Sequence, residues 1–146
     1  MKYLKGYKLF ESSEDINLLE VEEAFYNISD NFDVKVLSGG IEIFTTATEY
    51  NYITTNYSDL IDIIKVSIQS EKVPSMLEYD DIKDDLKFAV DYITNELDLS
   101  LLGLFIFNEY NRIHYKKNLK NIEVGYFRLI NLYFKKDTKK RAEISI

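Results

Sequence analysis

The stretch Glu78–Leu97, EYDDIKDDLKFAVDYITNEL, decides the fold class because it carries the periodicity of an amphipathic helix. Its apolar side chains recur at spacings of three and four and so share one helix face: Ile82, Leu86, Ala89, Val90, Ile93 and Leu97. The first turns hold four carboxylates, where the helix dipole favours negative charge: Asp80, Asp81, Asp84 and Asp85. We therefore expect a helix over 78–97 that packs its apolar face against a sheet.

Two further helices are expected upstream of this one. Serines at 12 and 13, or Asn17 with Glu20, can cap a helix over about 14–29. Its apolar stripe is Leu18, Val21, Phe25 and Ile28. Ser58 can cap a second helix over about 59–70, which ends before Pro74, the single proline of the chain. The stripe of that helix is Leu60, Ile61, Ile64 and Ile68.

Strand patterns occupy most of the remaining chain. Apolar and polar residues alternate over 32–38 and 41–48 around Gly39-Gly40, which predicts a hairpin. Residues 50–55 form either a third short strand or a tyrosine-rich loop.

The pattern after Leu97 is also that of strands. The run 99–107 is almost wholly apolar, as in a central strand covered on both faces, and a turn at 108–111 leads to a returning strand at 112–116. The stretch 122–134 alternates again, with a bulge expected near Gly125.

Helices segregated from hairpins predict an α+β two-layer sandwich, with about three helices on one face of a mainly antiparallel sheet. A ferredoxin-like variant is one candidate topology. We divide the chain into an N-terminal arm at 1–11, a single α+β domain at 12–134 and a basic C-terminal tail at 135–146.

The composition fits one domain with an ample core, since 46% of the 146 residues are hydrophobic and 14% are aromatic. There are no cysteines, so disulfides and thiol chemistry are excluded, and no apolar run has the length of a membrane span. We expect a cytoplasmic protein with no membrane partner.

The net charge of −7 is unevenly distributed: residues 1–100 hold 8 basic and 21 acidic side chains, and residues 101–146 hold 10 basic and 4 acidic side chains.

Motifs for chemistry are few. The single histidine, His114, has no cysteine or second histidine with which to share a metal, and we interpret it as structural. The four aspartates at 80–85 contain two pairs spaced by four, which could hold a divalent cation, but the helix dipole already explains acids there. Ser38-Gly39-Gly40 precedes a strand, whereas phosphate loops precede helices, so we interpret it as a turn. We expect no catalytic residue, metal ligand or cofactor.

Twelve tyrosines give the chain material for a binding surface. We name as the candidate surface Asp80, Asp81, Asp84, Asp85, Tyr110 and Tyr115. Tyrosines and lysines over 110–136 could also stack on single-stranded nucleic acid, and the basic tail could contact it, although tyrosine fills strands by ordinary preference.

The opening Met1–Ser12, MKYLKGYKLFES, resembles the start of small accessory proteins of large tailed bacteriophages, where such openings look like capsid-targeting peptides. Leu9, Glu11 and Ser12 are similar to the pattern of a prohead-protease site, which implies cleavage between Glu11 and Ser12. Serine departs from the alanine or glycine typical after the cut. The resemblance covers about twelve of the 146 residues.

We therefore expect a non-enzymatic phage accessory protein that binds a host or virion protein, either as an internal head protein or in the cytoplasm of the infected host cell. One alternative is an intracellular inhibitor of a host defence or nucleic-acid enzyme, in which clustered carboxylates imitate phosphates. A second is a small metal-dependent hydrolase built on the aspartates at 80–85.

Overall fold

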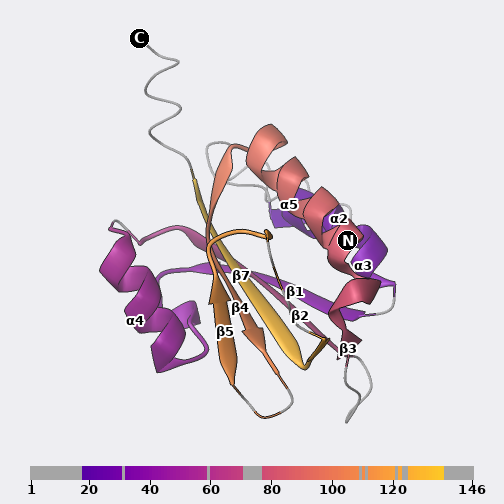
Figure 1. The fold of residues 1–146 in the computed structure, drawn as a ribbon. Coiled ribbons are helices and arrows are strands. Elements are labelled where there is room, and N and C mark those ends of the chain that lie inside the picture. Colours follow the sequence, from indigo (N-terminus) through magenta and orange to yellow (C-terminus); the bar gives the residue numbers. More distant parts are fainter. Residues whose placement is uncertain are drawn as a thin grey trace.

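The computed structural model describes residues 18–30, 32–58, 60–70, 77–108, 110, 112–120, 122 and 125–136. Its centre is a five-stranded antiparallel sheet, in the order β1 (Phe32–Gly39), β2 (Ile63–Ser70), β7 (Leu129–Lys136), β4 (Leu99–Phe107) and β5 (Ile113–Lys116). One face is covered by α2 (Leu18–Ala24), α3 (Tyr26–Ser29) and α5 (Lys83–Glu96), as Figure 1 shows. The predicted α+β two-layer sandwich is confirmed.

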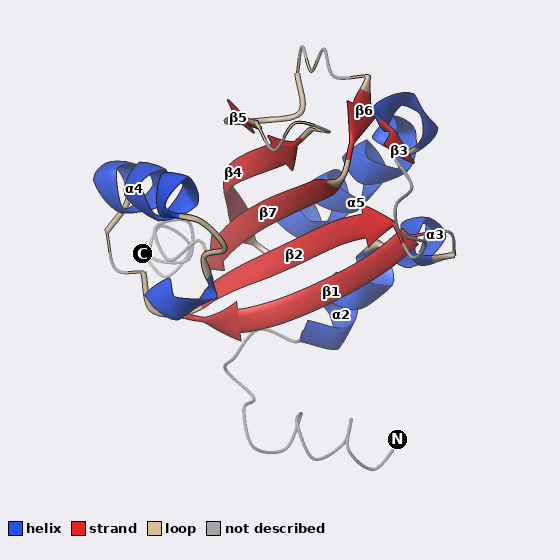
Figure 2. Ribbon diagram, turned by 90° about the horizontal axis from the view of Figure 1, so that it is seen from below, coloured by secondary structure: helices blue, strands red, loops and turns tan. Residues whose placement is uncertain are grey.

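The topology contains a split βαβ unit. The chain passes from β2 through α5 to β4, and β7 lies between these two strands, antiparallel to both. This arrangement is the building unit of ferredoxin-like sheets. In Figure 2 β1 lies at one edge of the sheet beside β2, and β5 lies beyond β4 at the other.

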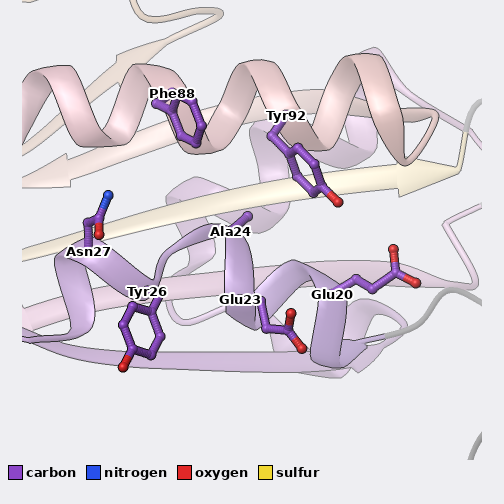
Figure 3. Close-up of a pocket in the computed structure, with 7 residues that line it drawn as sticks. All are labelled: Glu20, Glu23, Ala24, Tyr26, Asn27, Phe88 and Tyr92. Carbon is purple, nitrogen blue, oxygen red and sulfur yellow. The ribbon is translucent and has the colours of Figure 1, made fainter.

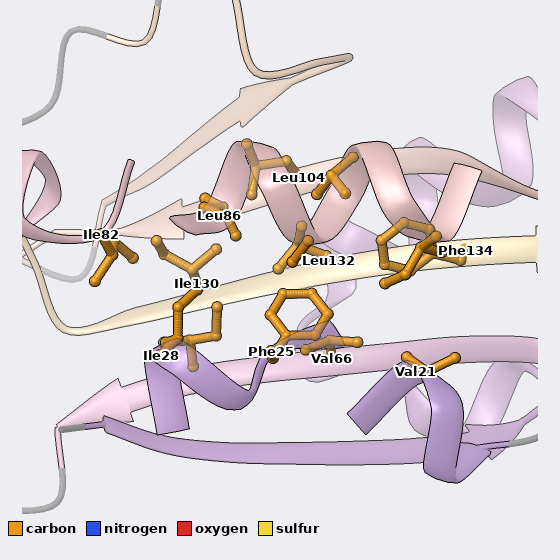
Figure 4. Packing of buried hydrophobic residues seen from close by; sticks show 14 of the residues in the cluster. Val21, Phe25, Ile28, Val66, Ile82, Leu86, Leu104, Ile130, Leu132 and Phe134 are labelled. Atoms are coloured by element: carbon orange, nitrogen blue, oxygen red, sulfur yellow. The ribbon is translucent and has the colours of Figure 1, made fainter. Parts of the chain in front are cut away.

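The main core lies between the sheet and these three helices (Figure 4). The predicted inward face of α5 is confirmed, because Leu86, Ala89 and Ile93 are fully buried. The stripe predicted for 14–29 is also buried at Val21, Phe25 and Ile28, although the helix is interrupted at Phe25, which separates α2 from α3. The expected helix start at residue 14 lies outside the described residues.

The predicted hairpin of 32–38 with 41–48 is wrong. Strand β1 pairs instead with β2 along its whole length, from Phe32 opposite Ser70 to Gly39 opposite Ile63. The intervening chain forms a 3-10 turn, η1 (Ile41–Ile43), and a helix, α4 (Ala47–Asn56), so residues 50–55 are neither strand nor loop. The physical reason is a capping box: the Thr46 side chain accepts from the Glu49 amide, and the Glu49 carboxylate accepts from the Thr46 amide.

The helix predicted over 59–70 is also wrong, because β2 occupies 63–70. Its isoleucines fit helix spacing, but the stretch is rich in β-branched residues, and its alternate side chains reach opposite faces of the sheet. Ile64, Val66 and Ile68 enter the main core, whereas Ile63 enters a second cluster beneath α4. Ile61, expected in the stripe, is 71% exposed.

The C-terminal predictions are largely confirmed. Strands β4 and β5 form the expected hairpin, and β4 is buried on both faces. A bulge was expected near Gly125, but the register shift in the main sheet lies in β4, between Leu101 and Gly103. The residues just after Gly125 form β6 (Tyr126–Phe127), which pairs with β3 (Leu77–Glu78) in a small second sheet. Residues 135 and 136, expected to begin the tail, are the last of β7.

Several predictions fall outside the described residues: the arm at 1–11 with its processing site, Pro74, and the tail from 137 onward. Among the helices that the structure describes, none combines the length and apolarity that crossing a membrane requires.

Candidate interaction surface

The predicted acidic residues sit at the start of α5. Asp80 and Asp81 belong to the 3-10 turn η2 (Tyr79–Asp81), and Asp84 and Asp85 to the first turn of α5. Asp80, Asp81 and Asp84 are exposed, Asp85 is half-buried, and the Asp80 carboxylate lies 3.5 Å from Lys83 Nζ. Within the described part of the chain, no three histidine or carboxylate side chains come close enough together to hold a metal ion.

The structure does not bring the two predicted tyrosines to these acids. Tyr110 lies in the turn between β4 and β5 and is 74% exposed. Tyr115 packs beside Tyr52 and Phe105 on the sheet face opposite α5. His114, on β5, has its Nε2 3.5 Å from the side-chain nitrogen of Asn108 and belongs to no group of three potential metal ligands among the described residues.

A hollow that no sequence motif predicted lies between α5 and the α2–α3 pair (Figure 3). Its volume is about 300 Å³. We call it the aromatic groove, and its lining residues are Glu20, Glu23, Ala24, Tyr26, Asn27, Phe88 and Tyr92. Figure 3 shows Phe88 and Tyr92 pointing from α5 toward the shorter helices, with Ala24 between the two walls.

The local sequence explains how the groove forms. Phe88 and Tyr92 are spaced by four and therefore lie on one flank of α5, beside the face that buries Ala89 and Ile93. On the other wall, the interruption at Phe25 starts a new helical turn in which Tyr26 projects outward and is 67% exposed.

Carboxylates set the electrostatics of the groove. Glu20 and Glu23 line it, and no basic side chain is among its described lining residues. The nearest lysine in sequence to Phe88, Lys87, donates a 2.8 Å hydrogen bond to Asp91. That bond and the charge of Asp91 raise the pKa of Lys87.

A second cluster of polar groups is buried beneath α4. The Glu49 carboxylate accepts hydrogen bonds from Tyr133 Oη at 2.8 Å and Asn131 Nδ2 at 2.9 Å. It also accepts from the amide and hydroxyl of Thr46, each at 2.9 Å. On the adjacent strand, Lys65 Nζ donates to the Ile43 carbonyl at 2.9 Å and to the Thr45 hydroxyl.

Burial governs the ionisation of this cluster. It lowers the pKa of Lys65, although the charge of Glu49 acts in the opposite direction. Burial and the Glu49 charge together raise the pKa of Tyr133, which keeps its hydroxyl protonated as a donor. Glu49, Asn131 and Tyr133 are all 0% exposed, so this part of the cluster is closed to solvent. We interpret it as the clamp that fixes α4 to the sheet.

Both features had a detectable signal in the sequence. Thr46-Ala47-Thr48-Glu49 matches the Thr-x-x-Glu capping box, which predicts a helix start at this point. The groove was signalled only by Phe88 and Tyr92, two aromatic residues on the polar side of an otherwise regular amphipathic helix.

No protein-family model matches the chain, and neither a curated protein nor a solved structure shows significant similarity to it.

Proposed function

We propose that this protein acts by binding another protein, one to one, through the aromatic groove. The observation that carries the proposal is the grouping of three exposed aromatic side chains around one hollow: Tyr26 is 67% exposed, Phe88 is 66% exposed and Tyr92 is 39% exposed. Single exposed apolar residues are common on proteins, but a cluster around a concavity is typical of an interaction site.

The energetics of the free chain support this reading. Phe88 stands on the same helix as Leu86 and Ala89, which are fully buried, yet its own ring remains largely in water. A ring in water contributes little to the stability of the fold, whereas its burial by a partner would remove apolar surface at roughly 25 cal/mol per Å². Tyrosine and other aromatic residues dominate binding energy in many protein interfaces.

Affinity purification with matched variants tests the proposal. Tagged full-length chain, Phe88→Ser and Tyr110→Ser are expressed in the producing cell, and co-purifying proteins are quantified by mass spectrometry. Position 110 is a suitable control because Tyr110 is at least as exposed as Phe88 but lies in the β4–β5 turn. We expect one protein to be retained by the wild type and by Tyr110→Ser and lost from Phe88→Ser. Equal recovery by all three chains would contradict the proposal.

The identity of the partner is a separate proposal, which rests on the N-terminal resemblance. A phage accessory protein delivered into the head would bind a virion protein, and in mature particles its chain would begin at Ser12. Glu11→Gln should leave the arm attached, because the protease pattern includes that carboxylate. Full-length chain recovered from mature particles would refute head delivery and favour a host partner inside the infected cell.

The alternative of a phosphate-imitating inhibitor finds support in one feature. Asp80, Asp81 and Asp84 are exposed together at the start of α5, so they could present charge to a nucleic-acid-binding surface. Replacing these three by asparagine should abolish binding under this alternative, whereas Phe88→Ser should abolish it under the proposal.

The hydrolase alternative needs a metal site at these aspartates, and they form no three-ligand group with any described side chain.

A further inference from the structure

We infer that the aromatic groove receives a cationic side chain, an arginine or a lysine, carried by an otherwise apolar segment of the partner. The inference rests on the proposed function and adds to it the chemistry of what is bound. It follows from the way in which the two walls of the groove differ.

One wall is aromatic, and the other carries two carboxylates beside the third aromatic residue, Tyr26. Phe88 and Tyr92 project from α5, whereas Glu20 and Glu23 project from α2, as Figure 3 shows. A ligand between the walls therefore meets the rings of Phe88 and Tyr92 on one side, and on the other the exposed Glu23 carboxylate near the Tyr26 ring. Arginine and lysine match both, because their aliphatic stems pack on apolar surface and their charged groups bind carboxylates and aromatic faces.

The size of the hollow limits what it can hold. A volume of about 300 Å³ is at the lower end of the range for small-molecule sites, so the groove has room for one or two side chains. Because the proposed function is protein binding, we take the bound unit to be a residue of a larger partner that covers the surrounding helices.

The cation has to come from outside this part of the chain. No lysine or arginine is among the described lining residues, and the two lysines of α5 are in ion pairs on the same helix. Lys83 is paired with Asp80 and Lys87 with Asp91. An acidic ligand would be repelled by Glu20 and Glu23, and a symmetric dimer through this face would place two acidic grooves against each other. We commit to a cationic side chain on an otherwise apolar segment of a different protein.

Nuclear magnetic resonance with small probes tests the inference directly. The ¹⁵N-labelled full-length chain is titrated with n-butylguanidinium chloride, which imitates an arginine side chain, and separately with n-butanol and sodium butyrate. We expect the guanidinium alone to shift the amide signals of Ala24, Asn27 and Phe88 in a saturable way. Raising the salt from 50 to 300 mM should weaken its binding several-fold, because an exposed ion pair is screened.

Two matched variants test whether the carboxylates of the groove cause the guanidinium to bind. Glu23→Gln should weaken guanidinium binding about threefold to tenfold, whereas Glu22→Gln, on the same helix but outside the groove lining, should leave it unchanged. Both positions are exposed, so neither substitution should alter the fold.

The outcomes separate this inference from the proposed function. If butanol binds as well as the guanidinium and Glu23→Gln has no effect, the groove is an apolar site and the inference is overturned while the proposed function stands. If no probe shifts the groove signals, and Phe88→Ser also leaves protein capture unchanged, both are overturned. A concentration-dependent dimer that Phe88→Ser abolishes would show that a second copy occupies the groove, which overturns the commitment to a different protein.

Discussion

The hydroxyl of Tyr133 on β7 donates a 2.8 Å hydrogen bond to the carboxylate of Glu49 on α4, a residue 84 positions earlier in the chain. Glu49 is completely buried, and the donors that surround it replace the water that its charge would otherwise bind. The bond thus joins the helix on the second face of the sheet to the central strand.

Removing either partner should destabilise the protein. Glu49→Ala removes the acceptor of the buried Tyr133 hydroxyl and leaves Asn131 Nδ2 only its longer bond to Thr45, and Tyr133→Phe removes one donor. We therefore expect losses of about 1–3 kcal/mol in the free energy of unfolding. The double variant should lose less than the sum of the single variants, which denaturant titration can measure as a coupling energy. Glu22→Ala, an exposed acid on α2, serves as the control and should change stability by less than about 0.5 kcal/mol. Strict additivity would show that the two groups do not act as one clamp.

Alanine substitutions along α5 should distinguish the side chains that stabilise the fold from those that line the aromatic groove. Leu86→Ala and Ile93→Ala each remove a large side chain from the packed core and should cost about 2–5 kcal/mol. Phe88→Ala, two residues from Leu86, removes a larger but mostly exposed ring and should cost about 0.5 kcal/mol or less. Thermal melting of the three variants checks this order. A large loss for Phe88→Ala would mean that its ring supports the fold and is not reserved for a partner.

Alkaline pH should unfold the protein partly through Tyr79. Burial, and secondarily the charge of Asp80, raise the pKa of Tyr79 to about 12 from an ordinary value of 10.0. Because the folded pKa lies above the unfolded one, the stabilisation from this group is complete below pH 10 and is lost as the pH rises through 12. The stability difference between wild type and Tyr79→Phe should therefore move in favour of the variant between pH 10 and 12. If the free energies of unfolding of the wild type and Tyr79→Phe changed in parallel with pH, this account of Tyr79 would be contradicted.

How far the sequence predicted the fold depended on whether one periodicity dominated a segment. The α5 stripe was unambiguous, since Leu86, Ala89 and Ile93 fit only a helix, and all three are buried. Residues 63–70 fit both periods, because isoleucines at 64 and 68 are spaced by four and also alternate with polar residues. These residues form a strand because they pair with β1 and β7 in the sheet, and such long-range pairing cannot be detected in a local sequence pattern.

The candidate site was less predictable for the same reason. Tyr110 and Tyr115 are close in sequence to basic residues but lie on different parts of the fold from the acidic start of α5. The aromatic groove joins residues from segments about sixty positions apart, Glu23 and Phe88 among them, so only the packing of α2 against α5 defines it. The sequence could show that Phe88 is out of place on a polar flank, but it could not show what lies opposite.

Photocrosslinking from position 88 is the most direct test of the claim that the aromatic groove binds a protein. The photoreactive amino acid p-benzoylphenylalanine replaces Phe88 in one full-length chain and Tyr110 in another, and both are irradiated in the producing cell. We predict one adduct of discrete mass from position 88, absent from position 110 and removed when Tyr26 and Tyr92 are both changed to serine. No adduct at position 88, or the same adducts from both positions, would contradict the account.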